Sequence, residues 1–175
     1  LVSFFNDISS EMLYPILPIF LTQVLGAPVF IVGIIEGIAE GSSSIFKTIF
    51  GYWSDKLQKR KPFIVFGYAL SSVSKVIIFL SYTWPFVFLG RFVDRLGKGT
   101  RTSARDAMLL DAANDTNKGF IFGFHRSMDS SGAVVGPVLT LLLLYLFHNN
   151  LRPILYLTAI PAFLSLIFFV FIKEA

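Results

Sequence analysis

Six largely apolar stretches run along the chain, and a short polar or proline-containing break separates each from the next. The breaks lie at residues 26–28, 56–62, 81–85, 111–119 and 148–153. A helix needs about 20 residues to cross the hydrocarbon core of a bilayer, whereas barrel strands are about half that length and alternate strictly. The pattern therefore predicts an all-α integral membrane protein, a single unit of six transmembrane helices over residues 1–175. The expected helices cover residues 2–25, 29–54, 62–81, 85–109, 119–147 and 153–172.

Composition supports this assignment to the membrane. Hydrophobic residues make up 54% of the chain and charged residues 15%, whereas soluble domains carry about 25% charged residues. Residues 154–172 contain no charge at all. The first and fourth stretches are polar enough that a hydropathy scan alone would miss them. The sequence has no cysteine, which excludes disulfide bonds and thiol chemistry.

The distribution of basic residues between the loops predicts the orientation. The second break holds Lys56, Lys59, Arg60 and Lys61, whereas the first and third hold no base and the fifth holds only Arg152. Cytoplasmic loops of membrane proteins carry the excess of Lys and Arg. We therefore expect a multi-pass protein of the cytoplasmic (inner) membrane with both termini in the cytoplasm.

Charged residues recur every three or four positions in several stretches, which places them on one face of each helix. In the fourth stretch this face holds Arg91, Asp94, Arg95, Lys98, Arg101 and Arg105. The first, second and fifth stretches have similar faces, formed by Asp7, Glu11 and Tyr14, by Glu36 and Glu40, and by His125, Arg126 and Asp129. The third stretch has only Lys75 and the sixth has no charge. Helices one, two, four and five are therefore expected to line water or a partner, and helices three and six to back them.

The charges within the predicted spans are expected to pair around a hydrated cavity. Each charge at the bilayer centre costs about 2.5–3.5 kcal/mol, and the spans hold six acids and eight bases. Ionisable residues at this depth usually mark a transport pathway. That reasoning makes Arg91, Asp94, Arg95 and Glu40 functional candidates.

Four other charged or titratable residues favour structural roles. Arg101 and Arg105 lie toward the cytoplasmic interface, where pairing or snorkelling is more common than substrate contact. Lys75 is expected to pair with an acid across the bundle. His125 is expected to act as a hydrogen-bonding residue rather than a proton relay.

No catalytic motif is present, so an enzyme is not expected. The segment 92–99 resembles a phosphate loop, but Phe92 stands where the first glycine belongs and Gly99 follows Lys98. Two histidines, His125 and His148, cannot build a three-histidine metal site. We expect no cofactor, no metal and no nucleic-acid partner.

Several motifs resemble those of the major facilitator superfamily. The segment "GYWSDKLQKRK" is similar to the signature between helices two and three, with Gly51, Asp55 and Lys56 in place and Gln58 where glycine is usual. The segment "GFHRSMDSSGAVVGP" resembles the antiporter motif of helix five through Gly123, Gly132, Gly136 and Pro137. Arg91 fits the arginine of helix four. The strings "DRLGKGTR" and "SSEMLYPILPIFL" are similar to a multidrug-efflux-like subgroup.

The resemblance implies the N-terminal half of such a transporter, built of two inverted three-helix repeats. It implies that helices one and four line the central cavity, that two and five face the second half, and that three and six back them. Asp55 should then pair with Arg101 or Arg105 in a cytoplasmic gate that includes Gly51 and Lys56. The second half is expected to be either a C-terminal half or a second copy of this chain in a homodimer.

Three functions remain open on the sequence. The first is proton-coupled efflux of a small organic molecule, with the lipid bilayer and H⁺ as further partners. Substrate and cavity candidates are Glu11, Tyr14, Arg91, Asp94, Arg95 and Lys98, and proton-coupling candidates are Asp7, Glu11, Glu36, Glu40 and Asp129. The second is uptake of an anionic metabolite, favoured by the excess of bases. The third is a membrane assembly or receptor unit that transports nothing.

Overall fold

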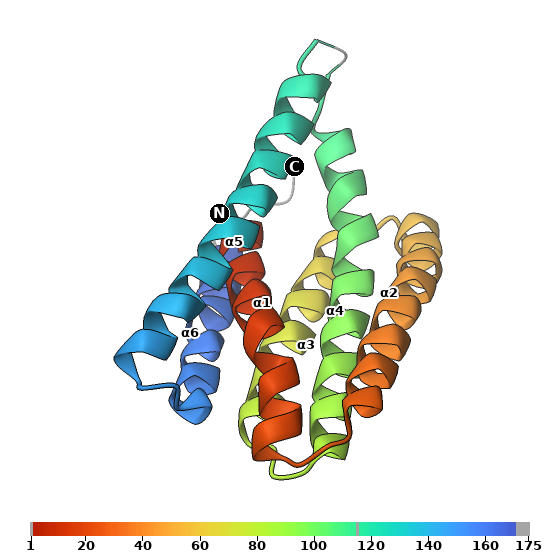
Figure 1. Ribbon diagram of the computed structural model, residues 1–175. Helices are drawn as coiled ribbons and strands as arrows, with labels where there is room; N and C mark the ends of the chain where they lie inside the picture. Colours follow the sequence, from red (N-terminus) through yellow and green to blue (C-terminus); the bar gives the residue numbers. More distant parts are fainter. Residues whose placement is uncertain (1, 115, 171–175) are drawn as a thin grey trace.

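The computed structural model of the protein describes residues 2–114 and 116–170, and nearly all of them are helical (Figure 1). The first helix, α1, is followed directly by a short π-helix, η1, and five further α-helices complete the described chain. Their bounds are α1 Val2–Ile19, η1 Phe20–Val24, α2 Val29–Leu57, α3 Lys61–Phe79, α4 Trp84–Asp111, α5 Lys118–Leu146 and α6 Leu151–Val170.

Prolines set several of these boundaries. Pro28 precedes α2 with extended backbone, and α3 and α4 each carry a proline in their first turn, Pro62 and Pro85. Proline is favoured there because the first helical N–H groups have no intrahelical partner. Inside α1, Pro15 and Pro18 lack the backbone N–H groups that would donate hydrogen bonds within the helix. The chain widens into η1 directly after them, as distorted helices do.

Four of the helices, α2, α3, α5 and α6, are long and apolar enough to cross a membrane. Two described helices, α1 and α4, do not meet that criterion because polar residues interrupt their apolar faces. The prediction that hydropathy alone misses these two helices is confirmed.

The helices pack in two groups. α4 packs against α2 and α3, while α1 packs against α5 and α6, and α3 contacts α6 between the groups (Figure 1). The connections from α2 to α3 and from α4 to α5 lie at one end of the bundle, where α1 begins and α6 ends. The connections from α1 to α2, α3 to α4 and α5 to α6 lie at the other end (Figure 1).

Glycines permit the closest of these contacts. A Cβ on Gly97 of α4 would lie 2.5 Å from the carbonyl oxygen of Gly67 on α3, closer than real Cβ atoms come. A Cβ on Gly136 of α5 would lie 2.7 Å from the Cβ of Glu11 on α1. Small residues of this kind let helix backbones approach where no larger side chain fits. The α3–α4 and α1–α5 distances are therefore fixed by these residues.

Candidate functional site

A cavity of about 330 Å³ opens between α1, α4 and α5, toward the end of the bundle where α1 begins. Its wall is charged and polar, although the bundle around it is apolar. The lining residues are Asp7, Glu11, Lys98, Arg101, Thr102, Arg105, Arg126, Asp129, Ser130 and Ala133.

Helical periodicity explains how three helices supply this wall. On α1 the two acids, Asp7 and Glu11, are four residues apart and therefore stand on one face. On α4 the lining positions begin at Lys98 and recur at three- and four-residue steps, and α5 repeats the pattern from Arg126. Each helix thus turns a single polar stripe toward the same space.

Asp129 is the most highly connected acid of the cavity. Ser3 donates a hydrogen bond to it at 2.5 Å, Nη2 of Arg105 lies 3.6 Å away, and Nδ1 of His125 lies 3.4 Å away. Arg105 also donates to the Ser3 hydroxyl at 2.9 Å. These contacts join α1, α4 and α5 across one side of the cavity.

Arg101 reaches from the cavity wall toward α3. Its Nη1 donates to the Ser71 hydroxyl at 2.6 Å, and its guanidinium carbon lies 4.9 Å from the centre of the Tyr68 ring. The residue is 4% exposed. A guanidinium over an aromatic ring is stabilised by the electron-rich face, so most of this side chain is committed to holding α4 against α3.

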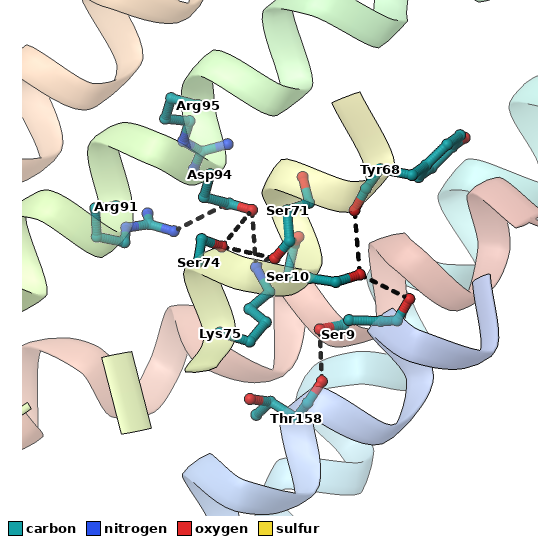
Figure 2. A network of polar contacts seen from close by, with 12 residues as sticks. Ser9, Ser10, Tyr68, Ser71, Ser74, Lys75, Arg91, Asp94, Arg95 and Thr158 are labelled. Carbon is teal, nitrogen blue, oxygen red and sulfur yellow. Dashed lines mark hydrogen bonds and ion pairs between the residues drawn. The ribbon is translucent and has the colours of Figure 1, made fainter. Parts of the chain in front are cut away.

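A second group of charges lies away from the cavity, buried between α2, α3 and α4. Nζ of Lys75 on α3 donates to Asp94 on α4 at 2.9 Å and to Ser10 on α1 at 3.2 Å (Figure 2). Asp94 also accepts from Ser74 at 3.3 Å, and Nη1 of Arg91 lies 3.8 Å from it (Figure 2). Lys75 and Asp94 are 1% and 2% exposed, so neither charge could be left there without its partner.

Two further ion pairs extend this network to α2. Arg91 binds Glu36 through two hydrogen bonds, at 2.8 Å and 2.5 Å. One turn along both helices, Nε of Arg95 lies 3.3 Å from Glu40. The arginines are nearly buried, whereas the two glutamates remain partly exposed on α2. The pairs therefore hold α2 and α4 together at two successive levels.

The structure brings part of the expected substrate and proton-coupling residues to this cavity and places the others elsewhere. Glu11 and Lys98 lie on the wall, but Arg91, Asp94 and Arg95 do not, because α2 and α3 cover that length of α4 and pair with its charges. Tyr14 is 61% exposed and is also absent from the lining. Of the proton-coupling candidates, Asp7, Glu11 and Asp129 line the cavity, whereas Glu36 and Glu40 lie outside it in the ion pairs with α4.

The expected gate pairing of Asp55 is also different in the structure. Asp55 forms an ion pair with Arg60, which lies 3.5 Å from Asp111 as well. Gln58 ends α2 with a left-handed φ of 50°, and this turn brings Arg60 back beside Asp55. The hydrogen bond to Asp55 raises the pKa of Arg60 above its ordinary value, so the guanidinium stays charged. Neither arginine expected from α4 reaches Asp55 among the described contacts, because both are held deeper in the bundle.

The other motif residues pack helices together. Gly51 on α2 lies against Ser103, whose hydroxyl donates to the carbonyl of Lys47 at 2.7 Å. Lys56 is exposed at the end of α2. Gly132 and Gly136 of α5 both contact α1, whereas a Cβ on Gly123 would meet nothing within 4 Å. Pro137 lies inside α5 next to this contact.

Four cavity residues were not among the predicted site residues: Thr102, Arg126, Ser130 and Ala133. Arg126 had a signal, since it lies on the polar face of its helix three residues before Asp129. The other three carry no charge, and only the packing of α5 beside α4 brings them to the wall. Within the described residues, no cluster of histidine and carboxylate side chains could hold a metal ion.

Comparison with known proteins places these features in a family. The family model described as "Major Facilitator Superfamily" matches residues 1–175. An uncharacterized MFS-type transporter of Methanocaldococcus jannaschii is 40% identical over 98% of this chain and 43% of its own length. The inner membrane transport protein YajR of Escherichia coli is 31% identical over 74% of this chain and 29% of its own length. The chain therefore spans less than half the length of these relatives.

Proposed function

The chain belongs to the Major Facilitator Superfamily, whose members are transporters rather than enzymes, and from this premise we propose that it forms the N-terminal half of a secondary transporter. The half would move a small organic solute across the cytoplasmic membrane by alternating access, exporting it in exchange for protons. The observation that carries the proposal is the charged cavity between α1, α4 and α5 in a bundle whose other helices include the apolar spans α2, α3 and α6.

The arrangement of helices supports two inverted repeats, α1–α3 and α4–α6. α1 packs against α5 and α6 of the second repeat, and α4 packs against α2 and α3 of the first. Exchanging the repeats converts one set of contacts into the other, as a pseudo-twofold axis in the membrane plane requires. On this proposal α1 and α4 hold equivalent places beside the transport pathway.

The exposed faces of α2 and α5 support a second half. Only four residues of α2 and three of α5 are buried. Along α5 a groove of about 720 Å³ is lined by one glycine, one arginine, three serines and two valines, among them Gly123, Ser127 and Ser131. Lipid tails offer nothing to these hydroxyl groups, so this face of α5 fits another helix bundle better than bilayer. A C-terminal half of the same protein, or a second copy of this chain, would cover them.

The carboxylates of the cavity are the proposed sites of proton coupling. Asp7 lies close enough to Asp129, Arg101 and Arg105 to interact with all three electrostatically. A carboxylate between another acid and two arginines binds or releases a proton as those neighbours move. Opening and closing of the cavity would change these distances, which links solute access to protonation.

The position of the cavity along the bundle supports an opening on the cytoplasmic side. Most of the lining residues come from the second half of α4 and the first half of α5, and the end of the bundle where these helices connect also carries the basic loop between α2 and α3. With that loop in the cytoplasm, the first residues of α1 and the last of α6 also lie there. Solute would then enter from the cytoplasm, as export requires.

Proton flux through the reconstituted transporter tests this function. The assembled transporter is reconstituted into proteoliposomes that enclose a pH-sensitive dye and a metabolite extract of the cells that express it. A proton gradient, acidic outside, is then imposed. We expect proton entry that depends on the extract and falls at least tenfold in Asp129→Asn. Asp106→Asn is the matched control, since Asp106 also contacts Arg105 but does not line the cavity. Equal proton entry with and without extract would contradict coupled transport.

A further inference from the structure

The chemistry of the cavity wall restricts what the site can bind. Nine of the ten lining residues are charged or carry a hydroxyl, and the tenth is Ala133. Sites for lipophilic drug-like molecules are lined mainly by hydrophobic and aromatic side chains. No aromatic residue lines the described part of this cavity. The wall therefore fits a small hydrophilic solute and not the lipophilic cations that multidrug exporters take.

Some charged residues of the wall form ion pairs or hydrogen bonds with other side chains of the bundle, and others do not. Asp129 is engaged with Arg105, Ser3 and His125, and Arg101 is engaged with Ser71 and the ring of Tyr68. These groups already satisfy one another within the bundle. A solute would have to break such contacts to bind them.

Two bases of the wall are not held by such contacts. Within the part of the chain that the structure describes, the ammonium of Lys98 and the guanidinium of Arg126 form no ion pair or hydrogen bond. They project from α4 and α5 into the same space, and both are exposed. Glu11 on α1 lines the same space and, among the described residues, forms no ion pair, whereas Asp7 interacts with Arg101 and Arg105. The wall holds four bases and three acids, so its net charge is positive.

We propose that the solute is a small hydrophilic organic anion, carrying a carboxylate or phosphate group, and that Lys98 of α4 and Arg126 of α5 both bind this group. The inference rests on the proposed transport function and names its substrate class. An ammonium and a guanidinium both form charge-assisted hydrogen bonds with such oxyanions. Arg101 and Arg105 position the helices and do not contact the solute.

The proposed charge also agrees with the direction of transport. In a cell with a negative interior, an anion that leaves and a proton that enters both move in the direction that the membrane potential favours. Export of a lipophilic cation gains no such help, because the cation leaves against the potential.

Binding measurements on the assembled transporter test the assignment. The probes are a series of small di- and tricarboxylates and phosphate monoesters, with tetraphenylphosphonium as the lipophilic cation, each assayed by calorimetry and by flux in proteoliposomes. We expect at least one anion to bind. Lys98→Gln and Arg126→Gln should each weaken its binding about tenfold to a hundredfold, the usual effect of losing a hydrogen bond to a charged group. Lys59→Gln is the matched control, because it removes one exposed base outside the cavity.

The variants must be folded for this comparison. Each is first checked for an unchanged melting temperature without ligand, and Lys98→Arg, which keeps the charge, should restore most of the anion affinity. Anion binding that is equally strong in Lys98→Gln, Arg126→Gln and the control would overturn the assignment of these residues.

Failure of the inference is distinguishable from failure of the function. Proton-coupled flux of tetraphenylphosphonium without flux of any anion would overturn the anion assignment and leave the proposed transport intact. Absence of proton-coupled flux with both probe classes and with the metabolite extract would overturn the transport function, and the anion assignment with it.

Discussion

The buried ion pair between Lys75 and Asp94 provides the sharpest test of how the bundle holds its charges. Replacing Lys75 with methionine keeps an unbranched side chain, one atom shorter, and removes the charge. Asp94 would stay buried and, among its described contacts, would keep the hydrogen bond from Ser74 and the more distant Arg91. Breaking a buried pair from one side costs about 3–5 kcal/mol, because an uncompensated charge remains.

Arg91 sets the size of the expected effect within this range. Its Nη1 lies 3.8 Å from Asp94, so it compensates part of the charge left unpaired, and its two hydrogen bonds to Glu36 limit how far its side chain can turn. We therefore expect a loss near 3 kcal/mol for Lys75→Met. For chains of 150–250 residues, 1 kcal/mol shifts the melting temperature by about 2–4 °C, which gives about 6–12 °C.

Thermal unfolding of the purified protein in detergent measures this shift, and a second substitution makes the test specific. Lys75→Met combined with Asp94→Asn removes both charges, so it should recover a large part of the lost stability. An unchanged melting temperature in Lys75→Met, or a double variant as unstable as the two single losses added together, would refute a buried, mutually dependent pair.

Two other substitutions test contacts of different kinds. Gly97→Val should destabilise the protein strongly or prevent folding, because its Cβ would lie 2.5 Å from the carbonyl oxygen of Gly67. A Cβ at Gly123 would meet no atom within 4 Å, so Gly123→Val should shift the melting temperature far less. Similar melting temperatures for the two variants would contradict the close α3–α4 packing. Arg60→Gln should lower the free energy of unfolding by no more than about 1 kcal/mol, because its partners Asp55 and Asp111 are both exposed. A larger loss, measured by thermal unfolding, would contradict this and show that the ion pair stabilises the fold.

Local features of the sequence predict much of the helical framework. Helices begin directly after or around Pro28, Pro62 and Pro85. Proline is tolerated at the start of a helix but disrupts the middle of one. The isolated charge of Lys75 on an apolar helix predicts an acidic partner across the bundle, and Asp94 is that partner. Such inferences need only the chain's own pattern and the cost of a lone charge in an apolar bundle.

The assignment of individual charges to the cavity could not be made in this way. Periodicity places Arg91, Arg95 and Lys98 on one face of α4, but it does not reveal which helices cover that face at each level. Around Arg91 and Arg95 the glutamates of α2 cover it, whereas Lys98 lines the cavity that α4 shares with α1 and α5. That change depends on contacts between residues far apart in sequence.

The pairing of Asp55 shows the same limit at shorter range. Gln58 occupies a left-handed conformation that few residues other than glycine and asparagine adopt. The resulting turn decides that Arg60, and not a base of α4, lies beside Asp55. A motif that matches a family pattern therefore identified the loop without identifying the partner.

The most direct test of the central claim is whether the cavity between α1, α4 and α5 opens to water and changes its accessibility during transport. The sequence contains no cysteine, so a single cysteine can be placed at Ser130 on the cavity wall or at Ser74 in the buried network. In oriented proteoliposomes, a membrane-impermeant maleimide added from the side of the basic loop should label Ser130→Cys rapidly and Ser74→Cys hardly at all. The rate at Ser130→Cys should change when a proton gradient is imposed. A labelling rate at Ser130→Cys that is negligible from both sides, or indifferent to the gradient, would contradict an alternating-access pathway through this cavity.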